Sequence, residues 1–357
     1  MKRLQYIILT ALLLASGCNK HSDSPVIQPE NRPIEVGIAS LTKAVFNDAL
    51  PSGEGFVVWA QCVNPEGTST DNAVFGTGGT KVYAPSWNYS PTRYWQKGTY
   101  SFAAVLPASV FNASYAATTE TLTAPYGTQG TNSLALNFGT GGYNLATEQD
   151  DIMVAFANID NTNSTMGTTI DGTLQKASLT FKHQFALVTI QAANLESRTT
   201  IRIDEIKVYG SKSTVGDIVL TYNPESGIIS SQYTLAGSTT KTDVYQTIQR
   251  PTQSGLSAAN DWRLSPNTGT QPTYDTLIPD LLVFPETCNF TIEVKYTDLY
   301  NDREITTTKT GTLPATWEAG KKYNYSFTIE LDGITFAEPT VQPWPTQSTS
   351  IDTELEM

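Results

Sequence analysis

Apolar and polar residues alternate along this chain in short runs, which is the period of a β-strand with one buried face. The alternation is clearest at residues 34–38, 100–106, 290–296 and 323–331, and turns rich in Gly and Pro separate the runs. No segment longer than two turns has the period of an α-helix. The pattern therefore predicts an all-β protein.

The run at residues 178–192 is predicted to form one long strand at mid-sequence. Its apolar residues change face between Phe185 and Val188. Either both faces are buried at its centre, or a bulge rotates it by one residue. His183 lies on the earlier apolar face, where an imidazole needs a hydrogen-bond partner but no catalytic role, so we interpret it as structural.

The length of 357 residues favours two domains. A polar, Asn- and Thr-rich segment at 158–172 is typical of a boundary. We expect two tandem antiparallel β-sandwiches, an N-terminal one at 33–172 and a C-terminal one at 173–336, followed by a tail at 337–357. Residues 221–270 show little pattern and are expected to hold long loops.

The N-terminus is typical of an exported lipoprotein. A charged start and a short apolar core precede Leu14-Ala-Ser-Gly-Cys18, which resembles the bacterial lipobox. Residues 1–17 are the predicted signal peptide, Cys18 is the predicted lipidation site, and 18–32 form a flexible tether. The alternative is an ordinary signal peptide with a chance cysteine.

Charge and cysteine usage narrow the function classes. The formal net charge of −12 excludes nucleic acid as an expected partner. Cys62 and Cys288 could form a disulfide in an exported protein. We favour two separate buried thiols, because they fall in different predicted domains.

Catalytic and metal-binding patterns are missing from the sequence. It has no His-Glu-x-x-His, phosphate-binding glycine loop, EF-hand loop or Cys-x-x-Cys. Asp150 and Asp151 precede a strand and are interpreted as a solvated turn rather than a pair of acids. We therefore predict neither an enzyme nor a metal or cofactor site.

Two further features are candidates for surface chemistry. Thr276, in Asp275-Thr276-Leu277, resembles the short O-glycosylation motif of Bacteroidetes. Four aromatic residues lie close in sequence and could stack on sugar rings, although the second pair could instead pack at the end of the sandwich: Trp87, Tyr89, Tyr94 and Trp95.

Several motifs together resemble the Bacteroidales fimbrillin family, the FimA/Mfa-like subunits of surface pili. They occur in the order Cys18, Thr42-Lys-Ala44, Tyr94–Pro107, Asp151–Ala155, Phe181-Lys-His183, Leu281–Pro285 and Trp317–Tyr325. The resemblance implies two transthyretin-like β-sandwiches and a lipidated precursor at the outer membrane.

The resemblance also implies assembly by strand exchange. In polymerising members a trypsin-like protease removes the first strand, and a strand of another subunit fills the groove. Here the strand plug is Ile34, Val36 and Ile38. The cleavage position commonly holds arginine in the family, whereas this chain offers Lys43. The C-terminal stretch 334–357 is the best internal donor, although prolines interrupt it.

Two functions follow as hypotheses. The first is a structural or accessory subunit of an adhesive fimbria, whose partners are other subunits, the outer membrane through its lipid, and host or bacterial surface ligands. The second is a monomeric outer-membrane lipoprotein that binds glycans.

Replacing the lipidation site tests the N-terminal interpretation. Cys18→Ala should leave an unlipidated, mislocalised precursor with intact β-structure, because the tether separates Cys18 from both predicted cores. Membrane fractionation checks this. A variant that fractionates with the outer membrane as well as wild type contradicts the lipoprotein assignment.

Overall fold

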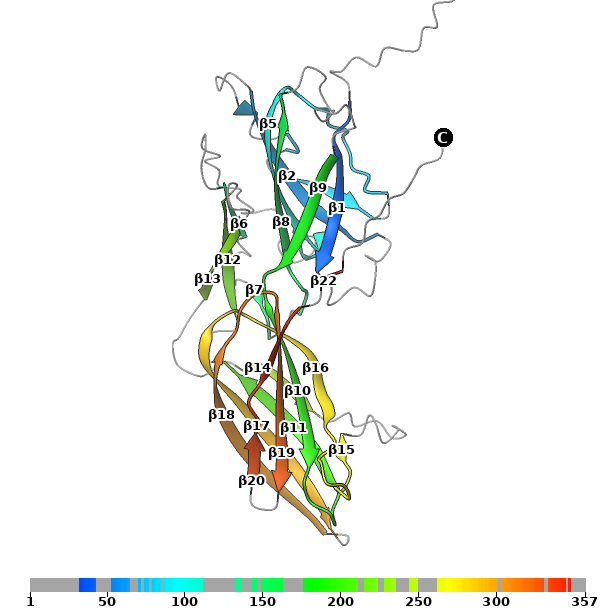
Figure 1. Cartoon of the computed structure of the whole chain (residues 1–357), viewed down its shortest axis with the longest axis vertical. Helices are drawn as coiled ribbons and strands as arrows, with labels where there is room; N and C mark the ends of the chain where they lie inside the picture. Colours follow the sequence, from blue (N-terminus) through cyan, green and yellow to red (C-terminus); the bar gives the residue numbers. More distant parts are fainter. Residues whose placement is uncertain are drawn as a thin grey trace, which may run out of the picture.

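The structure is a computed structural model of the whole chain (Figure 1). It describes residues 32–42, 53–64, 70–71, 74–76, 79–84, 86–111, 132–136, 143–146, 149–162, 176–210, 215–223, 228–235, 244–249, 262–300, 303–330, 333–344 and 346–347. Strands make up nearly all the regular structure of these residues, apart from a short 3-10 turn at Ala108–Phe111. The predicted all-β fold is confirmed.

The upper part of Figure 1 is built on an eight-stranded sheet. Its neighbouring strands are antiparallel except for one parallel pair, β1 with β9. In order they are β22 (Thr346–Gln347), β1 (Glu35–Thr42), β9 (Lys176–His183), β8 (Met153–Asn161), β5 (Gly98–Leu106), β2 (Gly55–Val63) and β3 (Thr70–Asp71), with β4 (Thr80–Tyr83) also on β2.

A four-stranded sheet lies beside it in Figure 1. Its strands come from both sides of the predicted domain boundary: β6 (Asn132–Leu136), β7 (Tyr143–Asn144), β12 (Val215–Asn223) and β13 (Ile228–Leu235). The strand β9 likewise follows residue 172 but pairs with β8. The predicted boundary at residue 172 therefore does not separate the sheets, and the division into two tandem domains remains a prediction.

The lower part of Figure 1 holds two five-stranded sheets. One contains β16 (Asp275–Val283), β10 (Ala186–Asn194), β19 (Lys321–Glu330), β20 (Gly333–Phe336) and β21 (Thr340–Pro343), with β10 and β19 parallel. The other contains β14 (Val244–Gln249), β11 (Ile201–Tyr209), β17 (Thr287–Tyr300), β18 (Arg303–Thr316) and β15 (Arg263–Leu264). Inward side chains of both sheets, such as Ile190 and Ile206, belong to one core, so the two sheets form a sandwich.

The strand β2 is buried on both faces, as its continuous apolar sequence predicts. Phe56, Val58 and Ala60 pack into a core beneath the segment 74–95. Val57 and Trp59 face the opposite way and join the core that continues into the lower sandwich. The eight-stranded sheet is therefore covered on both sides.

The predicted single strand at 178–192 is wrong, because the chain bends at Gln184 and Phe185. The strand β9 before the bend belongs to the eight-stranded sheet and buries alternate residues. The strand β10 after it enters the lower sandwich and is buried on nearly all of its length. The change of apolar face marks a passage between sheets rather than a bulge.

The structure also bears on the sequence predictions for β11, for residues 221–270 and for the C-terminal tail. The spacing of Ile201, Ile203, Ile206 and Val208 predicts a strand with a bulge at Asp204-Glu205, and the register between β11 and β17 does shift there. The residues 221–270, expected to hold long loops, contribute β13, β14 and β15. The expected tail from residue 337 contains β21, which pairs with β19, and Trp344 is buried. Among the residues described, no helix is long and apolar enough to cross a membrane.

Gly98 offers a test of the pairing between β2 and β5. A Cβ at this position would lie 2.4 Å from the Val63 carbonyl oxygen and 2.6 Å from Cys62 Sγ. Gly98→Ala should lower the free energy of unfolding by about 1–3 kcal/mol through overpacking. In urea denaturation Gly37→Ala is the control, because its Cβ meets nothing within 4 Å. Equal stability of both variants contradicts the close packing.

Candidate functional site

The first strand of the sheet, β1, is the candidate site. It pairs in parallel with β9 from Glu35 opposite Lys176 to Leu41 opposite Phe181, with an irregularity between Ile38 and Ser40. Parallel pairing brings a strand from the start of the chain beside one from its middle. The first strand is thus placed in the sheet by long-range contacts alone.

The predicted plug residues face the core. Ile34, Val36 and Ile38 are 1%, 4% and 8% exposed, and they pack in the same cluster as Leu179 and Phe181 of β9. Burying each of these side chains contributes about 1.5–3 kcal/mol. Glu35 points outward instead, and its carboxylate lies 3.4 Å from Lys176 Nζ in solvent. The alternation seen in the sequence therefore produces one buried and one solvated face.

The outer edge of β1 is largely open. On that side only β22 pairs with it, with Gln347 opposite Leu41 and Thr346 opposite Thr42. Among the residues described, no strand pairs with Glu35–Ala39 on this side. Removing β1 would leave β9 as the edge of the sheet, with backbone groups and apolar pockets exposed together.

His183 lies at the end of β9 nearest the lower sandwich. Its Nδ1 is 2.6 Å from Asp151 Oδ2, and both side chains are 1% exposed. The indole of Trp344 stacks on the imidazole, with ring centroids 3.8 Å apart and planes 6° from parallel. The burial and contacts of His183 are those that a structural role requires, and that role remains a prediction; the solvated turn expected at Asp151 is wrong, because Asp151 is buried.

The four aromatic residues do not form a common stacking surface. Trp95 is 1% exposed and packs edge-on against Tyr100, so it cannot stack on a sugar. Trp87 and Tyr89 are both half-buried: Trp87 packs on Phe56, and Tyr89 packs on Phe75. Only Tyr94, at 47% exposure, presents much of its ring to solvent. Packing explains most of this cluster.

Of the remaining sequence candidates, Thr276 is exposed on β16, the edge strand of its sheet, where Gln191 Nε2 donates a hydrogen bond to its hydroxyl at 3.2 Å. Its glycosylation remains a prediction. Cys18 and Lys43 lie outside the described residues.

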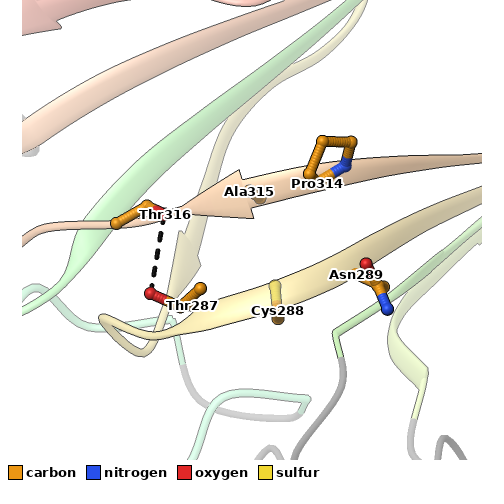
Figure 2. Close-up of a pocket in the computed structure, with 6 residues that line it drawn as sticks. All are labelled: Thr287, Cys288, Asn289, Pro314, Ala315 and Thr316. Atoms are coloured by element: carbon orange, nitrogen blue, oxygen red, sulfur yellow. Dashed lines mark hydrogen bonds between the residues drawn. The ribbon is translucent and has the colours of Figure 1, made fainter.

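The two cysteines are buried thiols in different cores, not a disulfide. Cys288 contributes to a shallow pocket of about 390 Å³ beside the ends of β17 and β18 (Figure 2). The other lining residues carry no charge: Thr287, Asn289, Pro314, Ala315 and Thr316. The residues that line this pocket therefore include no acid or base.

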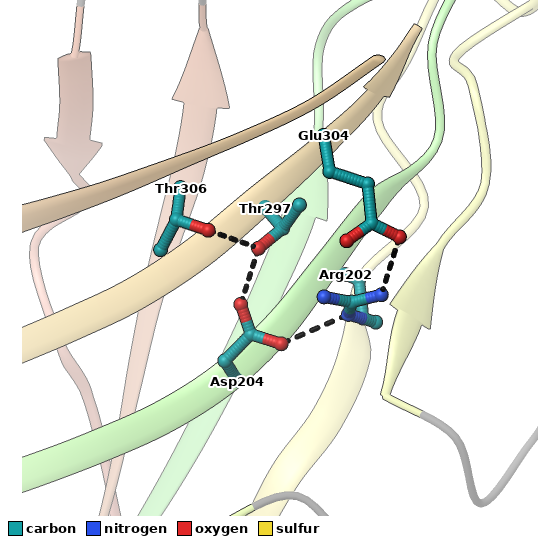
Figure 3. Close-up of polar contacts among 5 residues, drawn as sticks. All are labelled: Arg202, Asp204, Thr297, Glu304 and Thr306. Atoms are coloured by element: carbon teal, nitrogen blue, oxygen red, sulfur yellow. Dashed lines mark hydrogen bonds and ion pairs between the residues drawn. The ribbon is translucent and has the colours of Figure 1, made fainter. Parts of the chain in front are cut away.

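A polar cluster ties β11 to the β17–β18 hairpin (Figure 3). Arg202 contacts Asp204 at 2.9 Å and Glu304 at 3.2 Å, and the hydrogen bond to Asp204 is the main cause that raises the pKa of Arg202. Asp204 also accepts a hydrogen bond from the Thr297 hydroxyl. Arg202 thus offsets part of the negative charge of Asp204 and Glu304, and these contacts link β11, at its bulge, to both strands of the hairpin. Nowhere in the described part of the chain do three metal-ligating side chains converge.

The family model for fimbrillin-like proteins matches residues 42–344. The chain belongs to the fimbrillin-like family. Membership supports a structural role as a fimbrial subunit at the cell surface. No curated protein matches the chain.

Solved structures are similar to this chain at low sequence identity. A fimbrial protein from Bacteroides vulgatus is 15% identical with a TM-score of 0.55, over 88% of this chain and 100% of that chain. A protein with a proposed role in cell adhesion from Bacteroides ovatus is 14% identical with a TM-score of 0.43, over 88% and 98%. The fimbrial anchor protein Mfa2 from Porphyromonas gingivalis is 13% identical with a TM-score of 0.34, over 88% and 98%.

Replacing His183 tests its role. His183→Gln should lower the free energy of unfolding by about 1–3 kcal/mol, because the contact with Asp151 and the stack on Trp344 are both lost. Denaturant unfolding measures the change, and Lys182→Gln, on the exposed side of the same strand, should stay within about 0.5 kcal/mol of wild type. Unchanged stability with loss of assembly would show that His183 acts directly in function.

Proposed function

We propose that the protein is a structural or accessory subunit of an adhesive surface fimbria that assembles by β-strand exchange. The observation that carries the proposal is the placement of β1: one apolar face is buried in the core, and among the described residues its outer edge pairs only with the short β22. Such a strand can leave without breaking the interior of the sheet, and an extended strand from another subunit can take its place.

The C-terminal end of the chain is the donor that we propose. Residues 351–357, outside the described part, alternate Ile351, Thr353, Leu355 and Met357 with Asp352, Glu354 and Glu356. Ile351, Leu355 and Met357 fall on one period-two face, as Ile34, Val36 and Ile38 do, and Glu35 is the one acidic residue among 34–38. The neighbouring β9 presents Lys176 and Lys182 on its exposed face, where they would attract the acidic side of such a donor.

The location that goes with this function is the outer membrane. Lipidation of Cys18 would anchor the precursor, and cleavage after Lys43 would release β1 together with the lipid. A chain that escapes cleavage would stay on the membrane as a base or accessory subunit. The alternative, a monomeric lipoprotein that binds glycans, has less support, because Trp95 is buried and Trp87 and Tyr89 are half-buried against the core.

Cleavage by a trypsin-like protease tests strand exchange. Soluble protein cut after Lys43 should grow into rods, followed by light scattering and electron microscopy, while mass spectrometry fixes the cut. Lys43→Gln is the control and should stay monomeric under the same protease.

The contrary result is equally clear. If residues 33–43 leave and the remainder stays monomeric and as stable as before, strand exchange is not how this protein works. Rod growth by the uncut Lys43→Gln variant would also contradict the proposal.

A further inference from the structure

The segment 86–95 covers the start of β1 and is fixed by its own packing. Trp87 has a positive φ of 51°, unusual for a residue with a bulky side chain. Its ring lies 5.7 Å from that of Phe56. The ring of Tyr89 packs edge-on to Phe75 at 5.3 Å, and the buried Trp95 closes the segment. Contacts with the core therefore hold the backbone in a conformation that Trp87 alone would not favour.

Three hydrogen bonds run between this segment and the residues that lead into β1. The Ile34 N–H donates to the Arg93 carbonyl oxygen at 2.8 Å, and the Trp95 N–H donates to the Arg32 carbonyl oxygen at 2.9 Å. The Tyr89 hydroxyl donates to the Ile34 carbonyl oxygen at 2.6 Å. All three contact the main chain of Arg32 or Ile34, just before β1, so they do not depend on which side chains the entering strand carries.

We propose that Tyr89 is a positioning residue that, with the Arg93 carbonyl, sets the register of the strand in the groove. The proposal rests on strand exchange as the function and adds what the groove requires of any strand that enters it. We call these contacts of Tyr89, Arg93 and Trp95 the register clamp.

Register matters here because the side-chain period of a strand is two. A slip of one residue would turn Ile34, Val36 and Ile38 out of the core and bring Glu35 into it. The clamp grips the main chain immediately before and at Ile34, whose side chain is 1% exposed. An incoming strand must therefore place an apolar residue at this point of the clamp, and further ones two and four residues later.

The Tyr89 side chain is suited to this role. Burial is the largest cause that raises the pKa of its phenol, so the hydroxyl remains protonated and can donate at neutral pH. Tyr89→Phe removes this donor and keeps the ring that packs on Phe75. Tyr94→Phe is the matched control, because Tyr94 is in the same segment with an exposed ring.

Amide hydrogen exchange on the full-length protein is the first test. Tyr89→Phe should make exchange of the amides at residues 34–38 roughly two- to tenfold faster, the range for one lost hydrogen bond. Amides of β2 and β5 should keep the wild-type rate, and Tyr94→Phe should match wild type throughout. Faster exchange across the whole sheet would mean that Tyr89 has a merely structural role, which would overturn the proposal. An unchanged exchange rate at residues 34–38 would overturn it as well.

Strand competition is the second test and addresses register. Protein nicked after Lys43, with its N-terminal fragment still bound, is challenged with two synthetic strands. One has the sequence of residues 32–42, and the other has an Ala inserted between Pro33 and Ile34. The strand with the insertion can either form the hydrogen bonds of the register clamp or place its apolar side chains in the pockets, but not both at once. Wild type should prefer the first strand by about tenfold or more, and Tyr89→Phe should narrow this preference severalfold.

Equal discrimination by wild type and Tyr89→Phe would refute the register role. If neither strand displaces the fragment from wild type, strand exchange itself fails, while hydrogen exchange still decides whether the clamp holds β1.

Discussion

The core on the side of the eight-stranded sheet that faces the segment 86–95 depends on β1, the first strand in the sequence. Ile34, Val36 and Ile38 complete the cluster that includes Leu179 and Phe181, while among the described residues the opposite edge of β1 pairs only with the short β22. Side-chain burial and the pairing with β9 together hold β1 in the sheet. A strand held in this way can be replaced by another with the same apolar alternation, because the pockets and the edge of β9 make no demand on the rest of its sequence.

The plug is also connected to the lower sandwich. The C-terminal segment pairs with β19 through β21, passes Trp344, which stacks on His183, and then meets β1 through β22. His183 ends the strand that pairs with β1, and Asp151 precedes β8 in the same sheet. The buried contact of Asp151, His183 and Trp344 therefore joins the plug strand, its neighbours and the C-terminal segment in one continuous set of contacts.

Local pattern was enough to predict the strands whose two faces differ, such as β1, β17 and β19, and the bulge at Asp204. It failed where a strand carries little apolar sequence: in β18 Thr306 and Thr312 face Thr297 and Thr291 across the hairpin. It also failed where burial depends on a distant partner. The local sequence at Asp151 predicted a solvated turn. Its burial depends on contact with His183, which lies in β9 and cannot be recognised as a partner from the local sequence. Nor does any local signal show that β12 pairs with β6.

In the proposed strand exchange, the plug must be stable in the precursor and replaceable afterwards. Three aliphatic side chains at about 1.5–3 kcal/mol each are a large share of the 5–15 kcal/mol that stabilises a typical domain. Spontaneous loss of β1 is therefore rare. While β1 remains tethered, its effective concentration at the groove is on the order of millimolar, far above that of any free strand. Under the proposed mechanism, cutting the chain after the plug would remove this advantage without touching the groove, so cleavage, rather than unfolding, would open the site.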